Sequence, residues 1–223
     1  MLSKPNLNGI GMTSQRTRER LIGRLMEQGI KNHRVMDVMR TTARHIFLDE
    51  ALSHRAYEDV ALPIGYGQTI SQPYIVARMT EALVNTGEVN RVLEIGTGCG
   101  YQTAVMAHLS KEVYSVERIR PLLERARKNL KVLDIRNVEL KHADGSLGWP
   151  EKGKFDAIIK TAAPQQVPND LLEQLAEDGR LIIPVGGEAG QELRLITRRG
   201  DEYTIEVLSK VRFVPLLAGK SLG

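Results

Sequence analysis

The sequence predicts an α/β protein built on a doubly wound, mostly parallel sheet of seven strands, with a helical N-terminal extension. Between residues 91 and 185, short apolar runs alternate with stretches of helical period, which is the pattern of βαβ units. After residue 190 the apolar residues recur with a period of two, which indicates an antiparallel pair at one edge of the sheet. The 223 residues are 42% hydrophobic and 26% charged, a balance that excludes a disordered chain, a collagen and a coiled-coil rod.

The first part of the chain predicts the helical extension. We expect residues 1–13 to form a flexible N-terminal segment and Ser14 to be the N-cap of the first helix. Apolar residues recur at helical spacing in three stretches: 14–29, 32–41 and 74–86. A segment with several prolines and glycines, about 44–72, separates the second stretch from the third, and we expect it to be irregular.

The second part of the chain predicts the sheet. Five apolar runs are expected to be parallel strands: 91–95, 113–117, 137–143, 155–161 and 180–185. Helices are expected between most of them, at 101–109, 119–132 and 168–177. Two further strands, 192–199 and 203–213, follow as the antiparallel pair. We therefore expect a single domain over 14–223, with a helical part at 14–88 and an α/β core at 89–217.

The strongest motif is VLEIGTGCGYQTAVMA, in which a buried strand leads into Gly96, Gly98 and Gly100 and a helix follows directly. Glycines allow a sharp turn and a close approach of the backbone to a ligand. A nicotinamide dinucleotide site would need a glycine where Tyr101 stands, and a phosphate loop would need one where Val214 stands. Neither of these nucleotide-binding motifs is present.

Acidic side chains stand at the ends of three consecutive predicted strands: Glu94 inside the end of the first, Glu117 as the last residue of the second, and Asp144 just past the third. The carboxyl ends of parallel strands share one edge of a sheet, where doubly wound folds bind ligands. A carboxylate at Glu94 repels a pyrophosphate and suits a ligand with a positive amino group, such as S-adenosylmethionine. An acid in the position of Glu117 accepts ribose hydroxyls, and Asp144 with Gly145 can reach an adenine edge. The alternative is that the acids are solvated and the glycines merely turn the chain.

These residues resemble the motifs of the class I S-adenosylmethionine-dependent methyltransferases, which have a Rossmann-like sheet. Further segments narrow the resemblance to the bacterial protein-L-isoaspartate O-methyltransferases: TISQPYIVA, HADGSLGWPEKGKFDAIIKTAAP, LAEDGRLIIPVG and RFVPL. The resemblance extends over residues 14–217 in family order. Lys160 departs from it, because an apolar residue is expected in this strand. We expect Lys160 to lie at the strand end and to extend its ammonium toward solvent.

The resemblance implies a role for each matching residue. Ser71 would be the active-site serine, with Thr69, Ile70 and Gln72 as its substrate-binding neighbours. The cofactor-binding residues would be Glu94, Gly96, Thr97, Gly98 and Gly100 near the methionine end, Glu117 at the ribose, and Asp144 with Gly145 at the adenine. The implied reaction moves a methyl group from S-adenosylmethionine to the free α-carboxylate of an L-isoaspartyl residue, and the ester then closes to a succinimide.

Ser71 is expected to orient the acceptor and not to attack it. A free carboxylate with a pKa of roughly 4 is already ionised at pH 7, so the transfer needs no strong base. No G-x-S-x-G motif surrounds Ser71, and nothing in the sequence places a histidine and an acid around it. Ser71 also precedes Gln72 and Pro73, so the N-cap of the next helix is its alternative role.

Other functions fit the sequence less well. A nucleic-acid methyltransferase acting on amino groups would carry Asp or Asn before Pro-Pro-aromatic, where residues 161–164 read TAAP, and a cytosine C5 enzyme would need a Pro-Cys nucleophile. The intact ISQP segment argues against a cofactor-binding module without activity, and Tyr101 argues against an NAD oxidoreductase. Another class I methyltransferase with a small-molecule or nucleic-acid acceptor is the alternative that we keep.

The amino-acid composition limits the binding partners and the location that we expect. Cys99 is the single cysteine, which excludes an intramolecular disulfide and suits a reducing cytoplasm. The five histidines show no metal-ligand spacing, and the net charge of +4 is spread along the chain. No stretch approaches the ~20 apolar residues of a membrane helix. We expect a cytoplasmic monomer that acts on isoaspartyl proteins and peptides, with no metal, nucleic acid or membrane partner.

Overall fold

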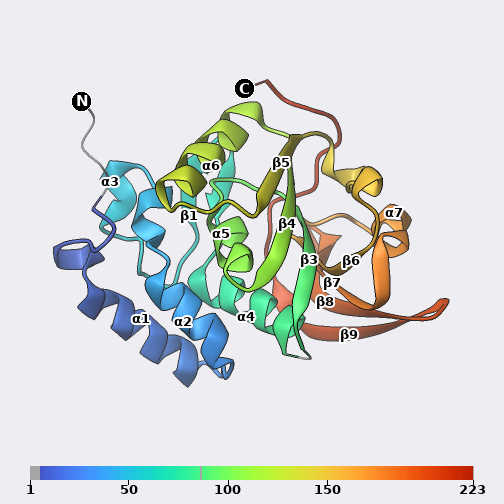
Figure 1. The fold of residues 1–223 in the computed structure, drawn as a ribbon, viewed down its shortest axis with the longest axis horizontal. Helices are drawn as coiled ribbons and strands as arrows, with labels where there is room; N and C mark the ends of the chain where they lie inside the picture. Colours follow the sequence, from blue (N-terminus) through green and yellow to red (C-terminus); the bar gives the residue numbers. More distant parts are fainter. Residues whose placement is uncertain (1–5, 86, 223) are drawn as a thin grey trace.

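The computed structural model describes residues 6–85 and 87–222. Their central element is a seven-stranded sheet with the strand order β5-β4-β3-β6-β7-β8-β9 (Figure 1). The strands are β3 (Val89–Ile95), β4 (Ser110–Glu117), β5 (Val138–His142), β6 (Phe155–Lys160), β7 (Leu175–Gly187), β8 (Gly190–Arg199) and β9 (Glu202–Val211). The five strands β5, β4, β3, β6 and β7 run parallel to one another, and β8 runs antiparallel to both of its neighbours, β7 and β9. The predicted fold class, with its antiparallel C-terminal edge, is confirmed.

Side chains alternate along the strands, so the core forms one layer on each face of the sheet. On β3, Val92 packs into one layer and Leu93 into the other, and both are fully buried. Three helices contribute to the first layer: α4 (Pro73–Val84), α5 (Tyr101–Ala107) and α6 (Arg120–Val132). The second layer contains Trp149 and Leu171, the latter from the short helix α7 (Asn169–Glu173).

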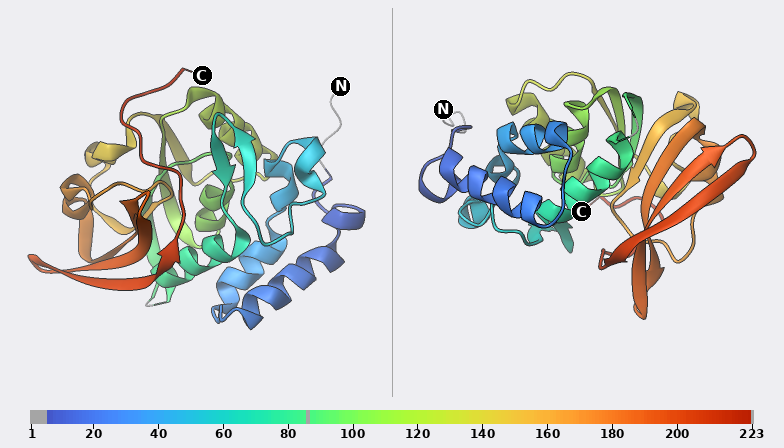
Figure 2. Two further views of the ribbon diagram at one scale, coloured as in Figure 1. Left: turned by 180° about the vertical axis from the view of Figure 1, so that it is seen from behind. Right: turned by 90° about the horizontal axis from the view of Figure 1, so that it is seen from below.

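The N-terminal helices lie on the same side of the sheet as α4 (Figure 2). They are α1 (Gln15–Glu27), α2 (His33–Thr41) and α3 (Glu50–Ser53), with 3₁₀ turns η1 (Gly11–Thr13) and η2 (Arg44–Phe47). Ser14 occupies the predicted N-cap position of α1, but its side chain makes no capping hydrogen bond. The expected flexible segment falls partly outside the described residues. Its residue Asn6 contacts the helical part, since its carbonyl lies 2.8 Å from Nε2 of His45.

The prediction of an irregular segment at 44–72 is wrong for its first part, which holds η2 and α3, and for its last part. There the chain forms a hairpin of β1 (Leu62–Gly65) and β2 (Gln68–Ile70). Tyr66 and Gly67 both have positive φ, as in the two-residue turns that join antiparallel strands. The two strands are too short to show an alternating pattern, and Pro63 is typical of an edge strand. The helix predicted at 74–86 is confirmed as α4.

The helix predicted at 168–177 extends too far. Helix α7 ends at Glu173, and Leu175 already pairs with Phe155 of β6 as the first residue of β7. The N–H of Phe155 donates to the carbonyl of Gln174 at 2.8 Å. Strand pairing therefore takes residues that have helical spacing in the sequence, since tertiary contacts override a local preference.

After β9 the chain crosses the carboxyl edge of the sheet (Figure 2, left). Pro215 forms a bridge with Ala163 after β6, and Ser221 forms one with Ile119 after β4. We call residues 213–222 the C-terminal strap. Among the described residues, no helix is long and apolar enough to cross a membrane.

Candidate active site

The carboxyl edge of β3, β4 and β5 carries the three acids that the sequence singled out. Glu94 is the penultimate residue of β3, Glu117 ends β4, and Asp144 follows β5 by two residues. These strands are neighbours in the sheet, so the acids stand along one edge in the order Glu94, Glu117, Asp144. The edge is rich in hydrogen-bond acceptors, which suits a ligand with donors and a positive charge.

The glycine loop joins β3 to α5, and protein contacts explain two of its glycines. Gly100 has φ +90°, and a Cβ there would lie 3.1 Å from Cβ of Ala126 on α6. Gly96 has φ +99°, and a Cβ there would lie 2.3 Å from Oγ1 of Thr161. A side chain at either position would therefore strain the backbone and push away a neighbouring element.

Glu94 lies beneath this loop, fully buried, and not at an open crevice mouth. Thr103 and Ser115 both donate to its Oε2 at 2.5 Å. The hydroxyls of Thr97 and Ser115 are 2.6 Å apart and share a hydrogen bond. Oε1 of Glu94 has no hydrogen-bond partner among the described residues. Burial raises the pKa of Glu94 to about 8, against the effect of the hydrogen bonds from Ser115 and Thr103.

Glu117 accepts hydrogen bonds from the backbone of two segments, the glycine loop and the chain just after β4. Its Oε2 accepts from the N–H of Gly98 at 2.8 Å, and its Oε1 accepts from the N–H of Ile119 at 2.9 Å. The side chain is 5% exposed, and burial raises its pKa. Each carboxylate oxygen has a second lone pair, so Glu117 can still accept from a ligand.

Asp144 joins the loop after β5 to the C-terminal strap. Its Oδ1 accepts from the N–H of Ser146 at 2.9 Å, and its Oδ2 accepts from the N–H of Gly219 at 2.6 Å. Although burial acts in the opposite direction, these hydrogen bonds and the charge of Lys160 hold the pKa of Asp144 below its usual value. Gly145 is itself enclosed, because a Cβ there would lie 2.5 Å from Cγ2 of Ile95.

Lys160 ends β6 as expected, but the expectation that its ammonium reaches solvent is wrong. The side chain is fully buried, and Nζ lies 3.5 Å from the carbonyl oxygen of Gly145. Lys160 shares a sheet face with Ile158, among apolar side chains. Burial lowers the pKa of Lys160 to about 8, and the negative charge of Asp144 opposes that change.

Ser71 follows β2 and is partly buried. It is not the cap of α4: the N-cap position belongs to Gln72, which makes no side-chain capping bond. Asp59, which lies in a different segment, caps α4 instead, because its Oδ1 accepts from the N–H of Tyr74 at 2.8 Å. Its Oδ2 accepts from Nε2 of Gln72 at 3.0 Å. The hydroxyl of Ser71 is thus not needed for capping. Of the other predicted neighbours, Thr69 is exposed and the side chain of Ile70 is buried.

The hairpin that leads to Ser71 lies against the glycine loop. A Cβ on Gly98 would be 3.3 Å from Cδ1 of Ile64, which belongs to β1. Arg125 of α6 donates to the carbonyl of Ile64 at 3.3 Å and to that of Phe47 at 2.8 Å. The structure therefore brings the ISQP segment of the helical part toward the acids of the sheet edge.

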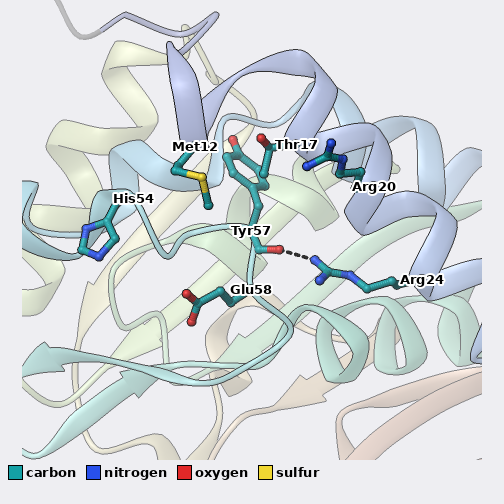
Figure 3. Close-up of a pocket in the computed structure, with 7 residues that line it drawn as sticks. All are labelled: Met12, Thr17, Arg20, Arg24, His54, Tyr57 and Glu58. Carbon is teal, nitrogen blue, oxygen red and sulfur yellow. Dashed lines mark hydrogen bonds between the residues drawn. The ribbon is translucent and has the colours of Figure 1, made fainter.

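A separate hollow lies between α1 and the segment before β1 (Figure 3). Its lining residues are Met12, Thr17, Arg20, Arg24, His54, Tyr57 and Glu58. Nη2 of Arg24 donates to the carbonyl of Tyr57 at 2.5 Å across it. None of the site residues predicted from sequence lines this hollow, so it is not the candidate active site. Within the described part of the chain, no group of three His, Cys, Asp or Glu side chains could hold a metal ion.

Sequence reasoning missed several residues that shape the site. Ser115 was recognisable as a polar residue inside a buried strand, and Thr103 as a hydroxyl in the first turn after the loop. Arg44, Asp59 and Gly219 gave no sequence signal, because each acts on residues far away in the chain.

Comparison with known proteins gives one family. The family model described as protein-L-isoaspartate(D-aspartate) O-methyltransferase matches residues 15–221. A protein-L-isoaspartate O-methyltransferase 1 of Marinobacter nauticus is 62% identical over 213 residues, which cover 96% of this chain and 97% of that protein. A protein-L-isoaspartate O-methyltransferase of Cellvibrio japonicus is 58% identical over 217 residues, 96% of each chain.

A solved structure agrees in fold. The crystal structure described as a putative protein-L-isoaspartate O-methyltransferase from Plasmodium falciparum, in complex with S-adenosyl-L-homocysteine, superposes with a TM-score of 0.79. It is 30% identical, and the match covers 90% of this chain and 98% of that one.

Proposed function

The chain belongs to the protein-L-isoaspartate(D-aspartate) O-methyltransferase family, and we propose that the carboxyl edge described above is the site where it works. The enzyme transfers a methyl group from S-adenosylmethionine to the free α-carboxylate of L-isoaspartyl residues in damaged proteins and peptides. The observation that carries this conclusion is the match to a single family over almost the whole chain.

The residues at the edge fit S-adenosylmethionine, which supplies an electrophilic methyl group on a positively charged sulfur when bound. Oε1 of Glu94 is a buried acceptor that has no partner among the residues described, and a donor group of the methionine end would satisfy it. A positive charge beside Glu94 favours its carboxylate form. Glu117 would accept from the ribose hydroxyls, and Asp144 with Gly145 would contact the adenine. Gly96, Thr97, Gly98 and Gly100 would form the cradle between them.

The acceptor needs positioning more than activation. Its carboxylate, with a pKa of roughly 4, is already ionised at neutral pH. The hydroxyl of Ser71 would hold this carboxylate in line with the methyl group, with Thr69, Ile70 and Gln72 around it, and the enclosed site would exclude water. Ser71 needs no activating partner for this role. The ester formed on the α-carboxylate then closes to a succinimide without further help from the enzyme, as a backbone amide nitrogen attacks the ester carbonyl and methanol leaves.

The direct test is transfer of radiolabelled methyl from S-adenosylmethionine to paired synthetic peptides that differ only in an isoaspartyl or a normal aspartyl residue. We expect label on the isoaspartyl peptide alone, and we expect it to be released by mild alkali, as for a methyl ester. Equal labelling of both peptides would contradict the assignment. So would a base-stable methylamine or labelled RNA, which would favour another class I methyltransferase.

The proposal also covers the domain organisation, the location in the cell, and the oligomeric state and partners. We propose one domain over 14–223, with the helical part at 14–88 and the α/β core at 89–217, because one buried apolar cluster contains side chains of both parts. We propose a cytoplasmic location, which the free and buried thiol of Cys99 supports. We also propose that the enzyme acts as a monomer, without metal or nucleic acid.

A further inference from the structure

Arg44 is a buried cation that links the two halves of the site. It lies in η2, and its side chain is fully buried. Nη2 donates to the carbonyl of Ser71 at 2.8 Å, and Nε donates to the carbonyl of Ala56 at 2.9 Å. Its guanidinium carbon stands 4.7 Å from the ring centre of Tyr101, the first residue of α5 after the glycine loop. One side chain therefore contacts both the segment that holds Ser71 and helix α5, which follows the glycine loop.

The charge of Arg44 has no anionic partner in the part of the chain that the structure describes. Among the described residues, no ion pair includes Arg44, and Nη1 has no hydrogen-bond partner. Its hydrogen bonds go to two carbonyl oxygens, and the other groups near its charge are the rings of Tyr101 and Tyr57 and the thiol of Cys99. A buried cation without an anion is unfavourable unless something compensates it. The acceptor of the proposed reaction is an anion that must lie next to Ser71.

We propose that Arg44 is a positioning residue for methyl transfer: it fixes the backbone of Ser71 relative to the glycine loop, and its uncompensated charge favours an ionised acceptor carboxylate at Ser71. This inference rests on the proposed function, because the carboxylate in question is that of the isoaspartyl residue. The guanidinium fork provides the geometry, since two of its nitrogens hold carbonyls of separate segments. The charge provides selectivity for a carboxylate over a neutral amide.

Two substitutions separate these contributions. Arg44→Met keeps the length and apolar packing but removes the charge and both hydrogen bonds. Arg44→Lys keeps the charge but loses the fork. Arg180 is the matched control, because it is also buried, donates from Nη1 to the carbonyl of Ala82 at 3.2 Å, and has an unpartnered Nε. It lies in β7, away from Ser71, so Arg180→Met tests the loss of a buried cation as such.

The measurements are kcat and KM for the isoaspartyl peptide, and S-adenosylmethionine affinity by calorimetry. Peptide binding is also measured with S-adenosylhomocysteine present, for the isoaspartyl peptide and for its carboxamide analogue. We expect Arg44→Met to raise KM about tenfold or more and to lower kcat, with cofactor affinity within about twofold of the wild type. Its preference for carboxylate over carboxamide should be lost. Arg44→Lys should recover KM and that preference but not kcat.

Arg180→Met should leave both kinetic constants unchanged. The inference is overturned if folded Arg44→Met has wild-type kinetics, or if Arg180→Met reproduces its kinetic changes. If Arg44→Met does not fold, Arg44→Lys decides alone: an unaltered kcat would overturn the inference. Failure of the proposed function is recognised separately, because the wild type would then not label the isoaspartyl peptide at all.

Discussion

Replacing Lys160 by methionine is expected to stabilise the protein at neutral pH. The side chain is fully buried, and its ammonium donates to the carbonyl of Gly145 at 3.5 Å. Methionine has a similar length, fills the same space and needs no hydrogen-bond partner. The substitution therefore removes a poorly compensated buried charge without opening a cavity.

The size of the effect follows from the pKa of Lys160, which burial lowers to about 8 from an ordinary 10.5. Between about pH 8 and pH 10.5 the unfolded chain binds more protons at this residue than the folded protein does. The free energy of unfolding of the wild type therefore rises with pH in that window. The full difference corresponds to roughly 3 kcal/mol, which is present below pH 8 and absent once the unfolded chain also loses the proton.

The assay is urea unfolding of the wild type and Lys160→Met at pH 7 and at pH 10. At each pH the free energy of unfolding of the wild type is subtracted from that of the variant, because the titration of the groups common to both proteins then cancels. We expect the variant to be more stable by up to about 3 kcal/mol at pH 7, with most of the difference gone at pH 10. Lys111→Met is the control, because Lys111 is exposed on β4. An equal difference at both pH values, or a less stable variant at pH 7, would refute the reasoning.

Three further substitutions test the site. Glu117→Ala should weaken S-adenosylmethionine binding roughly 10- to 150-fold in calorimetry, whereas Glu112→Ala, at the other end of β4, should not; equal affinities would remove Glu117 from the site. Ser71→Ala should lower kcat about tenfold with unchanged cofactor affinity and melting temperature, since Asp59 caps α4; wild-type turnover would contradict this. Gly100→Ala should destabilise the protein by about 1–2 kcal/mol in urea unfolding, whereas a helical control, Gly23→Ala, meets nothing within 4 Å and should not.

The fold could be predicted from the sequence because its signals are local. Apolar runs separated by helical patterns indicate parallel strands and crossovers, and the position of each acid at or just past the end of its strand places it at the carboxyl edge. Glu94, Glu117 and Asp144 therefore meet at one edge of three adjacent strands, as expected. The loop after β3 could likewise be recognised, since Gly96, Gly98 and Gly100 stand at alternate positions between an apolar run and a helical pattern.

The environment of each site residue could not be predicted, because it depends on contacts between distant segments. The burial of Glu94 requires Thr103 and Ser115 from two other elements, and the burial of Lys160 requires the loop after β5. The short hairpin before Ser71 has too few residues for a visible period. Strand pairing also converts residues after Glu173 from an expected helix into β7.

The sequence by itself determined which chemistry is present and on which strand end each group stands. Only the tertiary structure decided which groups are satisfied and which are not. Asp59, 15 residues before Tyr74, takes over the cap that Ser71 could have provided, and so leaves the Ser71 hydroxyl available. Arg44 reaches the carbonyl of Ser71 from 27 residues away. The physical reason is that hydrogen bonds and desolvation depend on distances in space, which side-chain periodicity does not encode.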